Sequence, residues 1–476
     1  MSSLSALNSL LGSSNAIDLS QILEAATGAS SPGIDVNAAV SAAVTAAEGP
    51  EDNWESQQTT LQNQASAMTS LQTDATNLDN DMHSLNSLTG PLSAATVTSS
   101  NSSVVTGSAV SGSAVGNNVV VVNGLATTAS FSSTPITGPV STTDLPTGET
   151  ITITSPTGQP ATYTTGTNGI NTLSDLENAI NTGGLGVTAS IVTDATGSRL
   201  AITSDTSGSA GSFTATATGG TFGVVPGATG NNSSITVNGI VFQSATNTVT
   251  GAIPGVTLNL VGSSPGTDIS VDVSPDTSQA SNAISQFVSD YNTLIGAVNA
   301  QYSDSGSGQG VLADDPTVEN LQNTLLQALD YTASPSSGST STTVPNLSSL
   351  GITVNTDGTL SVDSGTLSSA LQNNFSDVQN FFQGSALNGF ANSLDQQLTS
   401  FISPADGAFT VDLQSISTEN TGLQTDITNF QTNVIAPLKT QLQAEYSSAE
   451  IALQQLPAEV KNVDAELGEN NSSSGG

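Results

Sequence analysis

His83 is the only histidine of this 476-residue chain, and a histidine near serine and aspartate side chains could activate a nucleophile. In one common arrangement, the catalytic serine sits on a sharp turn between a strand and a helix. No such turn surrounds His83, which follows Met82 inside a stretch of helical periodicity. We interpret His83 as a surface residue beside an apolar stripe, and we predict no catalytic residue and no enzymatic activity.

Acidic side chains could instead bind calcium. Residues 355–363 include Asp357 and Asp363, but the segment lacks the alternating oxygen ligands and the distant glutamate of an EF-hand loop. The dipeptide Asp357-Gly358 is typical of the turn in a β-hairpin. The spacing therefore favours a hairpin over a metal site.

Two further acidic pairs also have structural interpretations. Asp314 and Asp315 precede Pro316, a pattern that predicts a capped helix start rather than a metal site. Glu51 and Asp52 could in principle form the carboxylate pair of a glycosidase. The chain has a single tryptophan and 45 glycines, so it offers no aromatic platform for a sugar. We expect no metal site and no cofactor.

The charge balance excludes several classes of partner. The chain has 39 acidic and 3 basic residues, a formal net charge of −36. Because phosphate binding requires clustered lysine and arginine, we predict no nucleic-acid partner, and an anionic membrane surface is disfavoured for the same reason. No apolar run reaches the roughly 18 residues of a membrane-spanning helix, so we predict no membrane insertion.

Residue usage also bears on the location of the protein. The absence of cysteine excludes disulfides and thiolate chemistry. The first thirty residues contain no lysine or arginine, whereas a secretory signal normally begins with basic residues. We infer that the protein either stays inside the cell or leaves it by a route that cleaves no signal.

Both ends of the chain carry apolar residues at sevenfold spacing, the a and d pattern of a coiled coil. We predict helix-seam and partner contacts at both ends. The first seam consists of Leu61, Met68, Leu71, Ala75, Leu78, Met82 and Leu85. The second seam consists of Leu442, Tyr446, Ala449, Leu453, Leu456, Val460, Val463 and Leu467. The two seams can meet within the chain, or they can contact a separate partner.

The spacing slips in phase before the second seam. Phe430, Val434 and Leu438 are spaced by four, which resembles a stutter and predicts local unwinding of a left-handed supercoil. Pro437 lies inside the slip, so we expect a kink there. Pro457 should cost the last helix about 3 kcal/mol unless the helix bends or breaks there.

The predicted fold class is α+β, with a terminal helical coiled-coil leg formed by both chain ends and β-rich head domains in between. Composition shifts divide the chain into six segments. These are a flexible N-terminal segment (1–32), an N-terminal helical leg (33–95), about two β-rich head domains (96–276), a mixed helix and hairpin part of the stalk (277–400), a C-terminal helical leg (401–470) and a flexible tail (471–476).

Local patterns place the main elements. A helix begins near Asp35 or Asn37 and is interrupted at Gly49-Pro50. Short strands separated by turn residues are predicted at 119–122, 151–153, 235–237, 256–260 and 269–273. Helical periodicity predicts helices at 172–180, 284–298, 318–329 and 367–378, and a β-hairpin is predicted at 351–363.

Five stretches, in order along the chain, closely resemble the flagellar filament cap protein family, also called hook-associated protein 2. The resemblance covers roughly residues 33–467, although the usual lysines and arginines of the first helix and final leg are nearly absent and Pro437 and Pro457 are unusual. The stretches are 33–37, 172–202, 247–260, 269–292 and 350–363.

The resemblance implies a structural cap at the tip of the growing bacterial flagellar filament. Such caps promote the folding and insertion of exported flagellin and prevent its loss. The implied partners are a ring-shaped homo-oligomer, taken as a pentamer, together with flagellin, the flagellar type III export apparatus, an export chaperone and the hook–filament junction proteins. The implied location is extracellular, at the filament tip, after export without a cleaved signal peptide.

Two alternatives remain open at this point. The chain could be another flagellar axial protein, either a hook–filament junction protein or a divergent flagellin. The order of motifs after Asn247 separates these alternatives from a cap protein. The chain could also be an extracellular adhesin that binds a surface ligand through its β-rich head.

Overall fold

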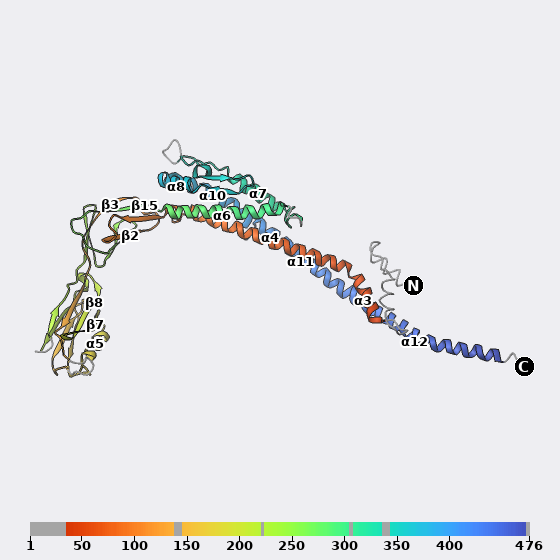
Figure 1. The fold of residues 1–476 in the computed structure, drawn as a ribbon, viewed down its shortest axis with the longest axis horizontal. Coiled ribbons are helices and arrows are strands. Elements are labelled where there is room, and N and C mark those ends of the chain that lie inside the picture. Colours follow the sequence, from red (N-terminus) through yellow and green to blue (C-terminus); the bar gives the residue numbers. More distant parts are fainter. Residues whose placement is uncertain (1–34, 138–144, 220–222, 304–307, 336–342, 473–476) are drawn as a thin grey trace.

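The computed structural model describes residues 35–137, 145–219, 223–303, 308–335 and 343–472. It confirms the α+β fold class, because helices from both chain ends form a long stalk and the sheets of the chain's middle lie at one end of it (Figure 1). The predicted flexible segment 1–32 lies outside the described residues, and the last helix continues to Ser472 within the predicted tail.

The stalk begins with two consecutive helices. α3 (Val36–Ala47) starts after Asp35, whose side chain accepts a hydrogen bond from the amide of Ala38, as expected of an N-cap. α4 (Gly49–Asn86) follows directly and carries Pro50 in its first turn, where a proline removes no intrahelical hydrogen bond. The predicted interruption is therefore a junction between two helices.

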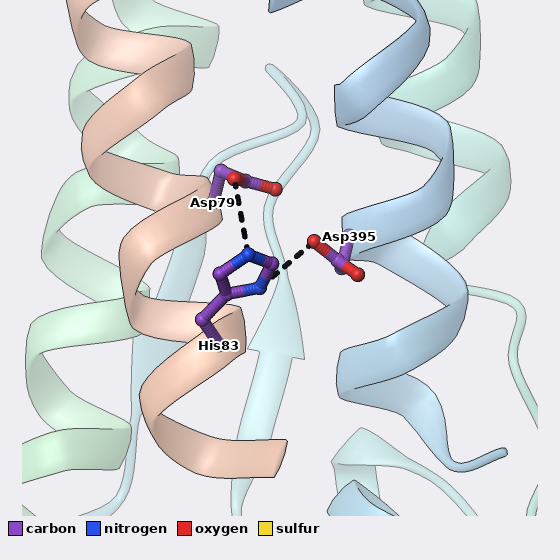
Figure 2. A group of neighbouring side chains, drawn as sticks. All are labelled: Asp79, His83 and Asp395. Carbon is purple, nitrogen blue, oxygen red and sulfur yellow. Dashed lines mark ion pairs between the residues drawn. The ribbon is translucent and has the colours of Figure 1, made fainter. Parts of the chain in front are cut away.

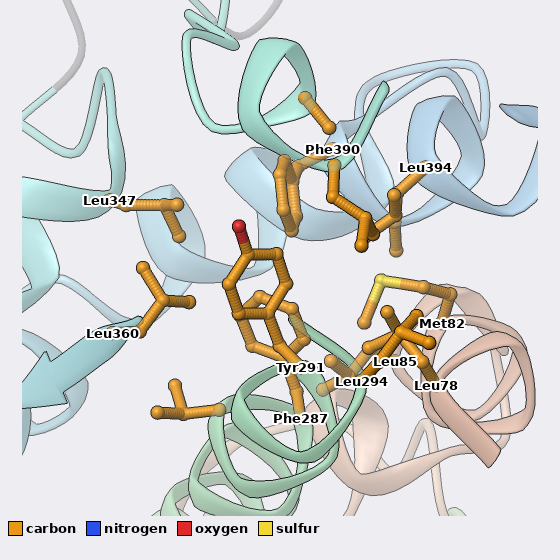
Figure 3. Packing of buried hydrophobic residues seen from close by; sticks show 14 of the residues in the cluster. Leu78, Met82, Leu85, Phe287, Tyr291, Leu294, Leu347, Leu360, Phe390 and Leu394 are labelled. Carbon is orange, nitrogen blue, oxygen red and sulfur yellow. The ribbon is translucent and has the colours of Figure 1, made fainter. Parts of the chain in front are cut away.

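The main core of the stalk lies between α4, α6 (Thr277–Tyr302) and α10 (Phe390–Ile402). Their apolar faces meet in one cluster, where the ring of Phe287 lies edge-on to that of Phe390 with 5.6 Å between centroids (Figure 3). Burying a side chain of this size stabilises the fold by about 1.5–3 kcal/mol. The core therefore fixes α4 between two helices that are far away in sequence.

Smaller elements complete this part of the stalk. α7 (Pro316–Ala328) begins after Asp315, which caps the helix as predicted. The strands β16 (Ile352–Val354) and β17 (Leu360–Val362) pair antiparallel and form the predicted hairpin. Gly358 in its turn has a φ of +82°, a conformation that favours glycine.

The single helix predicted from Leu367 to Val378 is wrong. The structure has two helices there, α8 (Ser364–Asn373) and α9 (Phe375–Gln383). Asn374 between them leaves the helical region, with φ −135° and ψ 34°. Asparagine is a weak helix former because its side chain competes for backbone hydrogen bonds. This explains why the segment forms two helices although its apolar spacing is continuous.

The β-rich region nearest the stalk contains two antiparallel sheets that share one apolar core. One has the strand order β1-β15-β3-β11-β12, and the other has the order β13-β14-β2. These strands are β1 (Ala95–Ser99), β2 (Val105–Ala109), β3 (Gly116–Gly124), β11 (Ser233–Val237), β12 (Ile240–Ser244), β13 (Thr248–Ile253), β14 (Val256–Leu260) and β15 (Ile269–Pro275).

The region farther from the stalk has its own apolar core, built from the sheets β10-β4-β8-β7 and β6-β5-β9 and from α5. α5 (Leu173–Thr182) confirms the predicted helix and begins with a capping box between Thr172 and Asp175. The strands are β4 (Thr128–Ser133), β5 (Thr150–Thr154), β6 (Pro160–Thr164), β7 (Val187–Asp194), β8 (Gly197–Ser207), β9 (Thr214–Thr218) and β10 (Val224–Pro226).

The chain returns along the stalk through α11 (Ala408–Phe430), the π-helical segment η4 (Gln431–Ile435) and α12 (Ala436–Ser472). In η4 the amide of Ala436 donates to the carbonyl of Gln431, five residues back, directly before Pro437. The phase slip is therefore accommodated by a wider helical turn. The backbone of α12 continues past Pro457 as helix.

Candidate functional site

The first seam is buried inside the stalk of its own chain. Its residues pack against α6, α10 and α11, and their exposed fractions are between 0 and 9%. Around Met82 and Leu85 they meet Leu394 and the aromatic cluster (Figure 3). In this conformation, these side chains hold the stalk together. The seam members are Leu61, Met68, Leu71, Ala75, Leu78, Met82 and Leu85.

The beginning of α4 runs antiparallel to α11 and η4. The rings of Trp54 and Phe430 meet edge to face with centroids 5.5 Å apart, and Gln58 Nε2 donates to the carbonyl of Asn420 at 3.3 Å. Gln431 Nε2 donates to a carboxylate oxygen of Glu51. These contacts place both chain ends in one helical leg.

Among the described residues, the two seams do not pack against each other along their length. α12 contacts α3, which has only small apolar residues on its buried face, rather than the first seam on α4. The sequence left open whether the seams meet each other or a separate partner, and in this structure α12 packs on α3 instead. The reason lies in the return path, because α11 and η4 already reach the beginning of α4 at Trp54 and Glu51, and α12 therefore continues alongside α3.

Most of the second seam is exposed. Leu442, Tyr446 and Ala449 are half-buried, and the side chain of Leu467 lies outside the described residues. α12 extends beyond α3 without a neighbouring helix among the described residues (Figure 1). Four second-seam residues on this extension form what we call the distal stripe, whose exposed fractions are between 42 and 53%: Leu453, Leu456, Val460 and Val463.

His83 lies between two aspartates from different helices, Asp79 of α4 and Asp395 of α10 (Figure 2). Its Nδ1 is 3.0 Å from Asp395 Oδ1, and its Nε2 is 4.0 Å from Asp79 Oδ2. Burial, followed by hydrogen bonding to Asp395, raises the pKa of Asp79 to about 6, although the nearby His83 opposes the rise. The two carboxyl groups are therefore largely buried, whereas the imidazole between them is exposed to solvent.

Sequence reasoning placed His83 correctly beside the apolar stripe but missed both aspartates. The spacing of four between Asp79 and His83 puts them on one helix face, a signal that could have been used. Asp395 comes from a helix more than 300 residues later, and no local pattern indicates that contact. None of the described helices is long and apolar enough to cross a membrane.

Three family models match this chain. One described as the C-terminus of flagellar hook-associated protein 2 matches residues 230–458, and one described as its N-terminus matches residues 32–129. A third, described as a flagellin hook IN motif, matches residues 150–206. These matches follow the order of the structure, from the first leg through the head and back.

Curated relatives agree with these models. The B-type flagellar hook-associated protein 2 of Pseudomonas aeruginosa is 34% identical over 160 residues, which are 32% of this chain and 32% of that protein. The A-type protein of Pseudomonas aeruginosa is 31% identical over 177 residues, 36% of this chain and 35% of that protein. The matched region thus spans about a third of the length of these relatives.

A solved structure has the same fold. The D1-D2-D3 domains of the flagellar cap protein FliD from Escherichia coli align with a TM-score of 0.55 and 24% identity, and the alignment covers 74% of this chain and 99% of that chain. Helices from both chain ends, with sheets in between, define an elongated stalk-and-head protein. The chain belongs to the flagellar hook-associated protein 2 family.

Proposed function

We propose that this protein is a structural cap at the tip of the growing flagellar filament. There it promotes the folding and insertion of exported flagellin and prevents the loss of flagellin into the medium. The proposal draws on membership of the hook-associated protein 2 family and on the fold shared with a protein named a flagellar cap protein. In this proposal the protein acts by binding, without enzymatic chemistry.

The distal stripe is the observation that carries the proposal. It is a row of exposed apolar side chains on a helix that has no neighbour among the described residues over this length. Such a stripe is typical of a helix that packs against a partner helix. The side chains are of moderate size, and charged residues such as Glu459 and Lys461 border them, so the contact can be weak enough to form and release repeatedly.

The proposed partners follow from this role. The protein assembles with copies of itself into a ring, which we take as a pentamer, and its leg contacts flagellin. It is exported by the flagellar type III apparatus with an export chaperone, without a cleaved signal peptide, and it adjoins the hook–filament junction proteins. The second seam and the distal stripe within it are the proposed contact residues of the leg.

A deletion strain tests the proposal. We expect hooks without filaments, and flagellin monomers in the medium. Complementation with the native chain restores filaments, whereas the Leu453→Ser, Leu456→Ser double variant restores them poorly. Val411→Ser is the matched control, because Val411 is an equally exposed apolar residue of the leg outside the stripe.

Other outcomes separate the alternatives. Normal filaments in the deletion strain would contradict the cap proposal. Normal filaments combined with impaired attachment to surfaces would favour an adhesin. That second function has one structural feature in its favour, namely exposed apolar residues on the head at Val115, Ile240, Val241 and Val261.

A further inference from the structure

We propose that Asp79, His83 and Asp395 form a binding site for a divalent transition-metal ion of the zinc class, which ties α10 to α4. The three side chains converge from two helices, and one ligand atom from each lies within 4.8 Å of the others (Figure 2). It is the one such group of three among the residues that the structure describes.

The buried carboxylate of Asp79 needs a positive partner. Asp79 is 8% exposed, and its Oδ1 is buried without a hydrogen-bond partner among the described residues. Its Oδ2 lies 4.0 Å from His83 Nε2, too far for a hydrogen bond. Burying a carboxylate without a partner costs free energy of folding, and binding a cation would remove this cost.

Neither lysine nor arginine supplies that cation. The three basic residues of the chain are Arg199 in the head and Lys439 and Lys461 on α12, all far along the chain from this cluster. Asp79 and Asp395 can share one proton, which a metal ion would displace. The imidazole of His83 has one short contact, to Asp395, and its side chain is 62% exposed. A metal ion would bind Asp79 and Asp395 at the same time.

The donor set fits zinc and its neighbours. One imidazole nitrogen and two carboxylate oxygens are ligands that zinc accepts at about 2.0–2.2 Å, with water completing the coordination. Tetrahedral ligands are then roughly 3.4 Å apart, so the most widely separated ligand atoms must approach by up to about 1.4 Å. The exposed ring of His83 can make this adjustment, and its exposure gives an ion access from solvent.

The composition of the chain makes the experiment sharp. His83 is the only histidine and there is no cysteine, so an imidazole-dependent metal site can exist at one place alone. The tag-free full-length chain is dialysed against zinc chloride, and its melting temperature is measured with and without the ion. We expect one zinc ion per chain and a melting temperature raised by several degrees, about the shift expected of a ligand in large excess.

Substitutions distinguish zinc binding at the proposed site from nonspecific binding of zinc to the acidic surface. His83→Ala and Asp79→Asn should each weaken zinc binding by at least about tenfold. Asp426→Asn is the control, because it removes one exposed carboxylate from α11 without touching the cluster. Equal zinc binding by the native chain and His83→Ala would overturn the proposal, and so would the absence of zinc binding to the native chain.

A second measurement on the native chain does not depend on how the variants fold. Diethyl pyrocarbonate modifies histidine, and His83 is the only histidine of the chain, so the ultraviolet absorbance of the modified imidazole reports on this residue alone. Zinc should slow this modification at least about tenfold, whereas magnesium, which prefers oxygen ligands, should have little effect. A modification rate that zinc leaves unchanged would contradict the proposed role of the imidazole.

Discussion

At the scale of single residues, carboxyl groups between α4 and α6 make the stalk sensitive to pH. Burial, followed by hydrogen bonding to Asp290, raises the pKa of Asp81 to about 7. Burial and the charge of Asp290 also raise the pKa of Asp74. In the unfolded chain an aspartate has a pKa of about 3.9, so the folded state holds these protons more tightly. Stability should therefore fall as the pH rises from about 4 to about 7.

Replacing Asp290 by asparagine tests this interpretation. Asp290→Asn removes the like charge and supplies an amide that can donate to Asp81, so we expect the free energy of unfolding at pH 8 to increase by about 1 kcal/mol. At pH 4 the gain should largely disappear. Thermal unfolding at both pH values measures the effect, and Asp426→Asn controls for the change in net charge. A gain of the same size at both pH values would contradict the interpretation.

The hairpin turn offers a second test at this scale. Gly358 has a φ of +82°, and a Cβ atom added there would meet the side chain of Leu326 at 2.9 Å. Gly112 has a similar φ of +79°, but an added Cβ meets nothing within 4 Å. Both glycine-to-alanine substitutions place alanine at a positive φ, which costs about 1 kcal/mol, and Gly358→Ala adds a steric contact with Leu326. Urea unfolding should therefore show a larger decrease in the free energy of unfolding for Gly358→Ala. Equal decreases would show that the Leu326 side chain moves aside at no cost.

At the scale of elements, α3 depends on α12 for its burial. Ala39, Val40, Ala43 and Ala47 form its buried face, and a helix of 12 residues is marginal by itself. Ala43→Asp places a charge in this contact and should destabilise it by on the order of 3 kcal/mol. Hydrogen exchange should then show loss of protection in α3 and at the beginning of α12, while α4 stays protected. Thr45→Asp, an exposed position on α3, is the control.

The elements that could be predicted from the sequence were those with local signals. Sevenfold spacing located the first seam, Pro50 marked the start of α4, and the Asp357-Gly358 dipeptide located the hairpin. The contacts of the first seam could not be predicted, because α6 and α10 come more than 190 and 300 residues later. The cluster at His83 required the same long-range information. Spacing alone also did not show that Asn374 would divide a helix.

The second seam shows what apolar spacing cannot predict. Its apolar spacing predicted a helix that contacts another helix, and the spacing does not state where the other helix comes from. In the structure, α3 covers the beginning of α12, and the distal stripe stays open. The structure of the single chain shows which seam residues remain exposed for a partner helix, whereas the sequence shows all residues that could form a helix contact.

At the scale of the whole molecule, the net charge of −36 governs how copies of the chain approach each other. Carboxylates outnumber basic residues 39 to 3, so few attractive ion pairs can form between subunits. Among the described residues, Arg199 pairs with Asp194 at 3.4 Å, and the remaining ion pairs involve His83. In the proposed ring, association must therefore come from apolar and hydrogen-bonded contacts that overcome electrostatic repulsion.

If the protein forms the proposed ring, salt should promote this assembly rather than weaken it. At about 10 mM salt the screening length is about 30 Å, so facing subunits repel each other across a whole interface. At about 300 mM salt only carboxylates in close contact across the interface still repel each other, so apolar surfaces such as the distal stripe can associate. Sedimentation velocity at pH 7.5 should show a larger oligomer at the higher salt concentration. The same oligomer at both concentrations would show that repulsion does not control assembly.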